Sequence, residues 1–125
     1  MGRAAAPPTV LLVEDEVLIS HLVADWLSER GFAVHELTTA DAALRYIKEG
    51  RAIDVLFTDV NLPGDIDGAE LALRARAMRP DLPIVYASGR YSYSDLGTVV
   101  PRSLFMSKPY NPADICTLLR RMTER

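Results

Sequence analysis

The stretch that decides the fold is VLLVEDE, residues 10–16. With Thr9 before it, this stretch begins with a continuous apolar run of strand length, which is typical of a strand buried on both faces of a sheet. Three acidic residues follow directly, so the strand runs into a polar, negatively charged end. A strand of this kind predicts a parallel sheet with helices on both faces.

The rest of the chain alternates short apolar runs with longer amphipathic ones. We expect strands at residues 9–13, 33–37, 54–58, 84–87 and 104–106. We expect one helix that Gly31 ends, a second between the capping residue Thr39 and Gly50, a third at residues 69–79, and a last one capped by Asn111. The expected apolar face of the first helix is Ile19, Leu22, Val23, Trp26 and Leu27. This alternation implies right-handed crossovers and a three-layer α/β domain with a five-stranded parallel sheet.

Composition limits the function classes. The 125 residues are 49% hydrophobic and 25% charged, which fits one globular domain at residues 9–125 after a short tail at residues 1–8. The net charge of −3 argues against binding nucleic acid or anionic lipid over a broad surface. The single cysteine, Cys116, suits a reducing compartment, and neither a signal peptide nor a membrane-spanning run is visible. We therefore expect a cytoplasmic domain.

Chemically active side chains follow the expected strands. Glu14 and Asp15 come after the first strand and Asp59 after the third, while Ser88 and Lys108 follow the fourth and fifth. Because ligands bind at the carboxyl ends of strands in such sheets, we expect these side chains to share one edge.

This set of residues indicates phosphoryl transfer. Carboxylates packed together repel one another and need a cation, and oxygen ligands that leave room for water and phosphate favour Mg²⁺. A lysine such as Lys108 can bind phosphate, and the small Gly89 leaves space for an oxyanion. Asp59, at the end of a buried strand, is the best candidate nucleophile. Each residue alone has an ordinary structural explanation, but their coincidence at successive strand ends does not.

Four sequence blocks resemble those of a known family. They are residues 10–16 (VLLVEDE), 58–64 with 67–68 (TDVNLPG and DG), 87–89 (ASG) and 107–110 (SKPY). In this order and spacing they are similar to the signature blocks of response-regulator receiver domains, over the chain from about Val10 to its end.

The resemblance implies a doubly wound sheet of strand order 2-1-3-4-5. It implies that Asp59 accepts a phosphoryl group from a histidine kinase or a histidine phosphotransfer protein. Mg²⁺ would be held by Asp15, Asp59 and the backbone carbonyl of Asn61, with Glu14 acting largely through water.

The resemblance also implies a switch. Ser88 would bond the phosphoryl oxygen, Lys108 would pair with it, and Phe105 would be the aromatic residue that turns inward when Ser88 moves. The Lys108-Pro109 peptide bond would be cis. The responding surface would comprise the connection between the fourth and fifth strands, the fifth strand and the last helix, and it would contact an output protein or domain. On this interpretation the chain is a phosphoacceptor with self-catalysed transfer and dephosphorylation, and not otherwise an enzyme.

Three features depart from the common pattern. Asp65-Ile66 stands where the family has one residue, which should alter the loop beside the site without moving Asp59. Arg90 places a cation near the entrance, where with Asn61 and Gly89 we expect it to modulate the phosphorylated state. The connection between the fourth and fifth strands is short, and its glycine, β-branched residues and proline predict a short or irregular fourth helix. Tyr91, Tyr93 and Leu96 would then be available to a partner.

Two other functions remain open from the sequence. A domain of this kind can act as a protein-interaction module without phosphorylation. Residues 65–68 (DIDG) resemble the paired-aspartate motif of haloacid-dehalogenase-type phosphatases, although that motif should directly follow a buried strand. The sequence does not distinguish a stand-alone regulator from a piece of a longer or hybrid protein.

Overall fold

The computed structural model describes residues 6–89 and 100–124. The elements follow in the order β1 (Thr9–Val13), α1 (Val17–Glu29), β2 (Ala33–Leu37), α2 (Ala40–Lys48), β3 (Val55–Asp59), α3 (Gly68–Met78), β4 (Ile84–Ser88), β5 (Ser103–Ser107) and α4 (Pro112–Thr123). The expected irregular helix between the fourth and fifth strands, with Tyr91, Tyr93 and Leu96, falls at residues 90–99 and lies outside the described residues.

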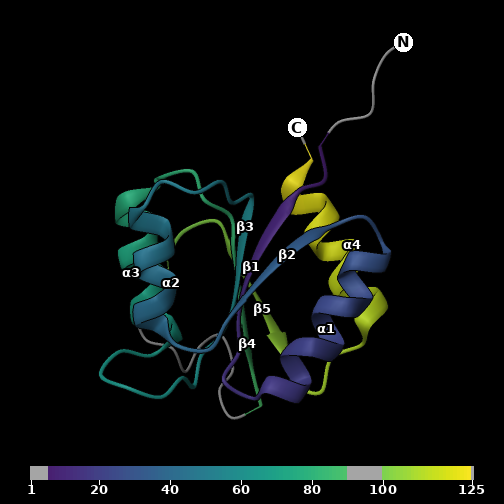
Figure 1. Cartoon of the computed structure of the whole chain (residues 1–125), viewed down its shortest axis with the longest axis horizontal. Coiled ribbons are helices and arrows are strands. Elements are labelled where there is room, and N and C mark those ends of the chain that lie inside the picture. Colours follow the sequence, from purple (N-terminus) through teal and green to yellow (C-terminus); the bar gives the residue numbers. More distant parts are fainter. Residues whose placement is uncertain (1–5, 90–99, 125) are drawn as a thin grey trace.

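The five strands form one parallel sheet in the order β2-β1-β3-β4-β5. This confirms the fold and the strand order implied by the resemblance. Helices α2 and α3 cover one face of the sheet, and α1 and α4 cover the other (Figure 1). β1 and β3 lie in the middle, so the residues that follow them come together at the centre of one edge.

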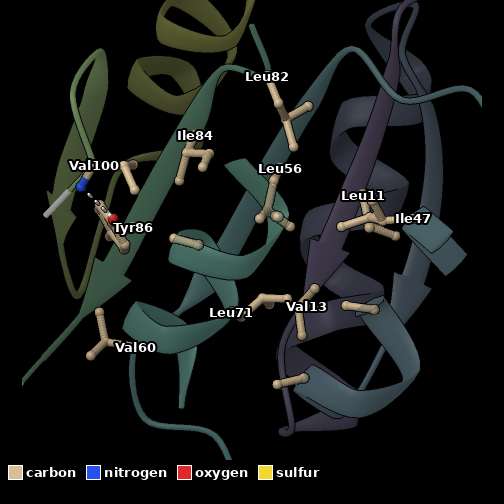
Figure 2. Close-up of a cluster of buried hydrophobic side chains, with 14 residues drawn as sticks. Leu11, Val13, Ile47, Leu56, Val60, Leu71, Leu82, Ile84, Tyr86 and Val100 are labelled. Atoms are coloured by element: carbon tan, nitrogen blue, oxygen red, sulfur yellow. Dashed lines mark hydrogen bonds between the residues drawn. The ribbon is translucent and has the colours of Figure 1, made fainter. Parts of the chain in front are cut away.

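Alternate residues of the central strands face two separate cores. Leu11 and Leu56 belong to the cluster under α2 and α3, which Figure 2 shows with Leu71 of α3 and Ile47 of α2. The neighbouring residues of the same strands, Val10, Leu12, Val55 and Phe57, belong to the cluster under α1 and α4. A strand with apolar neighbours on both faces needs the unbroken apolar run that the sequence shows.

Local sequence sets the helix ends as expected, within a residue or two. The Thr39 hydroxyl accepts the Ala42 N–H at 3.1 Å at the start of α2. The Asn111 side chain accepts the Ala113 N–H at 2.8 Å at the start of α4. Such caps satisfy backbone donors that have no partner inside the helix. Gly31, at φ +93°, follows the end of α1 in a conformation that glycine adopts without strain.

The apolar face expected for α1 is wrong at Leu22. Its side chain is 71% exposed, whereas Ser20, Ala24 and Leu27 are buried. Leu22 lies two residues from both Ser20 and Ala24, slightly more than half a turn, so it points to the opposite side of the helix. Small residues face the sheet here, and apolar periodicity alone did not distinguish the buried face from the solvent face.

The third strand ends one residue later than expected, so Asp59 is its last residue. Its position therefore depends on the backbone pairing of a central strand and not on a loop. Within the described part of the chain, every helix is too short or too polar to span a bilayer.

Candidate functional site

The strand ends bring the predicted acidic residues together. Glu14 and Asp15 follow β1, and Asp59 ends the neighbouring β3. One carboxylate oxygen from each of the three lies within 4.8 Å of the others. Glu14 and Asp59 are 3% and 8% exposed, whereas Asp15 is open to solvent. The three carboxylates form a group that could hold a metal ion.

Lys108 enters this group from the end of β5. Its Nζ lies 2.7 Å from Glu14 Oε1 and 3.3 Å from Asp59 Oδ2. The Lys108 N–H also donates to the Ser88 carbonyl at 2.9 Å, and the Lys108-Pro109 bond is cis, as the resemblance implies. The ammonium therefore bridges the two buried acids and offsets part of their repulsion.

Glu14 contacts the protein through both of its carboxylate oxygens, and its expected role near the metal, largely through water, stays a prediction. Its Oε1 binds Lys108, and its Oε2 accepts the Glu16 N–H at 3.1 Å. Both oxygens therefore have partners within the protein. Glu14 is therefore the nearer carboxylate partner of Lys108, whereas Asp15 and Asp59 line the cavity described next.

Three of the charged groups at the site have shifted pKa values. Burial raises the pKa of Asp59 from its ordinary value of 3.8 to about 6; Lys108 lowers it and Glu14 raises it. The pKa of Asp15 is also raised, chiefly by burial and by its hydrogen bond with Glu14. Burial lowers the pKa of Lys108, but the hydrogen bond and charge of Glu14 and the charge of Asp59 outweigh it, so that the pKa is raised overall. Burial is thus the main cause of the raised pKa values of Asp59 and Asp15, whereas the acidic partners of Lys108 raise its pKa against the effect of burial.

A cavity of about 390 Å³ opens on the carboxylates. Its lining residues are Asp15, Glu16, Asp59, Asn61, Gly89 and Lys108. The Asn61 N–H donates to Asp59 Oδ1 at 3.4 Å, which places the start of the β3–α3 loop at the cavity. The cavity is polar and lies at the centre of the edge, where an α/β sheet places its ligands.

Ser88 and Phe105, which the resemblance predicts to form a switch, lie on the neighbouring strands β4 and β5. Ser88 ends β4 and is buried, one residue beyond the pair formed by Asp59 and Ala87. Phe105 pairs with Tyr86 between β4 and β5, and it is half-buried against the cluster that contains Tyr86 and Val100. Figure 2 shows Tyr86 and Val100 at the edge of that cluster, joined by the hydrogen bond from the Val100 N–H to the Tyr86 hydroxyl.

The structure thus places Glu14, Asp15, Asp59 and Lys108 together, as the sequence predicts. Asn61 and Gly89 line the same cavity, while Arg90 lies outside the described residues. The functional roles of these residues stay predictions.

Sequence reasoning missed two backbone contacts of Asp59. The Thr58 hydroxyl donates to the Asp59 carbonyl at 2.9 Å, and Gly68 lies directly against the same carbonyl. Gly68 belongs to the DG block that the sequence comparison singles out. Its contact with the Asp59 carbonyl could not be predicted, because the two residues meet only through the path of the β3–α3 loop.

The parallel sheet, with three acids and a lysine at its carboxyl edge, is the arrangement that the sequence resemblance predicts. A family model described as the response regulator receiver domain matches residues 10–120. The chain therefore belongs to the response regulator receiver domain family.

The chain is similar to part of several longer proteins and to a solved receiver domain. The chain is 33% identical over 123 residues to the transcriptional regulatory protein CreB of Escherichia coli (strain K12), which covers 94% of the chain and 51% of CreB. It is 31% identical over 121 residues to the sensor kinase CckA of Brucella abortus (strain 2308), covering 94% of the chain and 13% of CckA. A solved response regulator receiver protein from Sinorhizobium medicae WSM419 matches with a TM-score of 0.88 at 31% identity, over 94% of each chain. The chain thus spans about half the length of CreB and a smaller part of CckA.

Proposed function

We propose that this receiver domain accepts a phosphoryl group on Asp59 in a Mg²⁺-dependent reaction. The observation that carries the proposal is the position of the Asp59 carboxylate. It lies at the end of a central strand, 3.3 Å from Lys108 Nζ, at a cavity that two further acids border. This arrangement combines a nucleophile with a cation that can neutralise a transferred phosphoryl group.

The reaction joins Asp59 to the phosphorus of a phosphohistidine. An Asp59 carboxylate oxygen forms the new P–O bond as the P–N bond to the imidazole breaks. The electron pair of the broken bond stays on the imidazole nitrogen. Lys108 stands where it can pair with the phosphoryl oxygens, and the Ser88 hydroxyl is the proposed hydrogen-bond donor at the end of β4.

The residues present fit Mg²⁺. The ion prefers oxygen ligands and keeps several waters, and Asp15, Asp59 and the Asn61 carbonyl would hold it here. When bound, it would supply positive charge to the transferring phosphoryl group. The raised pKa values of Asp15 and Asp59 agree with this fit, because a bound cation would stabilise the ionised carboxylates that burial and the neighbouring Glu14 disfavour.

A protein phosphodonor fits the surface next to the cavity. Glu16 lines the cavity, and Val17 and Leu18 follow it at the start of α1 with 52% and 79% of their side chains exposed. Leu22, one turn beyond Leu18 on α1, is also exposed, so an apolar surface that a docking protein could cover begins next to Glu16. This supports a histidine kinase or a histidine phosphotransfer protein as the donor, in the cytoplasm.

The switch and its output follow from the same site. We propose that Ser88 moves toward a phosphoryl group on Asp59 and that Phe105 moves inward with it. The change would reach an output protein or domain through the surface of β5 and α4. Beyond its own phosphorylation and dephosphorylation, the domain would act as a signal carrier and not as an enzyme.

The phosphatase alternative is less well supported. Asp67 caps α3, since its side chain accepts the Glu70 N–H at 2.9 Å, and Asp65 lies in the preceding loop. Neither aspartate is at a strand end, where Asp59 stands. An interaction module independent of phosphorylation remains the second candidate, because half-exposed apolar side chains on α1 and β5 suit it as well.

Intact mass after incubation with acetyl phosphate and Mg²⁺ tests the proposal. We expect the mass of one added phosphoryl group, absent in Asp59→Asn and absent when a chelator replaces Mg²⁺. Asp65→Asn is the matched control and should be labelled like the parent protein. Full labelling of Asp59→Asn would refute Asp59 as the acceptor, and no labelling of the parent would favour the interaction module.

A further inference from the structure

Gly68, the first residue of α3, lies against the backbone of Asp59. A Cβ atom at Gly68 would lie 2.0 Å from the Asp59 carbonyl oxygen, 2.8 Å from the Asp59 carbonyl carbon and 2.9 Å from Val60 Cα. All three atoms belong to the backbone, so no side-chain rotation can relieve the contact. Gly68 does not have a positive φ, unlike Gly31 and Gly64. Space, and not backbone conformation, requires glycine here.

Hydrogen bonds hold this close approach on both sides. The Gly68 N–H donates to the Val60 carbonyl at 2.8 Å, and the Val60 N–H donates to the Ala87 carbonyl at 2.9 Å. The Thr58 hydroxyl binds the Asp59 carbonyl at 2.9 Å. Because β3 is also paired with β1 and β4, the strand end is held more firmly than the loop that leads into α3.

The loop between Asp59 and Gly68 carries a second part of the site. It begins at Val60 and Asn61, and the Asn61 N–H faces Asp59 Oδ1. Asn61 also lines the cavity. The hydrogen bond from the Gly68 N–H to the Val60 carbonyl holds the residue that links Asp59 to Asn61.

We propose that Gly68 is a positioning residue for phosphoryl transfer. Its lack of a side chain lets α3 begin against the Asp59 carbonyl, and this closure sets the relative position of the Asp59 carboxylate and Asn61. The inference rests on the proposed function of Asp59 as phosphoacceptor.

The size of the expected effect follows from the distances. Real Cβ atoms essentially never approach another heavy atom closer than 3.0 Å, so an alanine at 68, at 2.0 Å, must separate the two segments by at least the difference of 1.0 Å. A misplacement of about 1 Å between reacting groups can slow a reaction about 100-fold. We therefore expect phosphorylation of Gly68→Ala to be about 100-fold slower.

The test compares Gly68→Ala with Ala75→Gly. Ala75 is buried in the same helix about two turns away, so Ala75→Gly weakens α3 without touching Asp59. Initial rates of labelling by acetyl phosphate with saturating Mg²⁺ are followed by intact mass, where circular dichroism shows both variants to be folded. We expect a loss of about 100-fold for Gly68→Ala and of less than about threefold for Ala75→Gly. Equal rates in Gly68→Ala and the parent would overturn the inference, as would equal losses in the two variants.

A crystal structure of Gly68→Ala keeps the inference testable if the proposed function fails. Absence of labelling in the parent protein would refute the proposed function alone. In that case, loss of the contact between the Asn61 N–H and Asp59 Oδ1 in the Gly68→Ala structure would support the inference. An unchanged contact would refute it. If Gly68→Ala folds only with a stabilising osmolyte, the parent, Gly68→Ala and Ala75→Gly are all compared in that osmolyte.

Discussion

Replacing Asp59 by asparagine should stabilise the unphosphorylated, metal-free domain. The parent carboxylate is nearly buried beside Glu14, and these surroundings raise its pKa from 3.8 to about 6 despite Lys108. A carboxyl group whose pKa is raised by folding destabilises the folded state once it is ionised. The penalty is absent below about pH 3.8, grows as the pH rises to about 6, and is complete above that value.

The size of the gain follows from the same pKa values. A difference of about two pH units corresponds to about 3 kcal/mol, which is the upper limit of what removing the charge can return. Asparagine keeps the shape of the side chain but loses its attraction to Lys108, so we expect a gain of about 1–3 kcal/mol in the free energy of unfolding above neutral pH.

Urea unfolding of the parent and of Asp59→Asn, followed by circular dichroism, measures this gain. The difference in free energy of unfolding should be near zero at about pH 4 and reach its full value at about pH 8. Asp25→Asn, an exposed change on α1, is the control and should alter the stability little at either pH. Mg²⁺ should stabilise the parent more than Asp59→Asn. A destabilised Asp59→Asn at about pH 8, or a gain independent of pH, would refute the electrostatic argument.

Three further changes test neighbouring parts of the structure. Asp15→Asn should weaken Mg²⁺ binding measured by calorimetry, and unchanged Mg²⁺ affinity would exclude Asp15 as a ligand. It should also raise metal-free stability slightly, by less than about 1 kcal/mol, because solvent screens the repulsion between the exposed Asp15 and its neighbours. Lys108→Met should lower the free energy of unfolding by about 2 kcal/mol or more at neutral pH, because it leaves the buried Glu14 without its counter-ion; a neutral effect would show that Glu14 does not depend on Lys108. Asp67→Ala should cost about 1 kcal/mol through loss of the α3 cap and leave Asp59 labelling intact, whereas abolished labelling would show that Asp67 serves the site itself.

Much of this domain follows from the sequence alone. Continuous apolar runs identify strands buried on both faces, and residues such as Thr39 and Asn111 mark the starts of helices because their side chains satisfy the first free backbone donors. Because parallel strands end at one edge, the order of residues also predicts that Asp15, Asp59 and Lys108 meet. The strands and helix starts depend on local sequence. The meeting of the site residues depends on the parallel order of the strands, which places all strand ends at one edge.

Only the tertiary structure shows which side chains and backbone groups from different segments of the chain contact one another. Apolar spacing could not show that Leu22 faces solvent, because the buried side of α1 is defined by the small residues that fit against the sheet. Residue type could not show that Glu14 turns both oxygens toward Lys108 and the backbone, since side-chain direction depends on where β5 ends. Likewise, Gly68 contacts Asp59 only because the loop between them folds back on itself. A linear sequence carries the identities of these residues, but contacts among backbone atoms arise only once the strands and helices are packed.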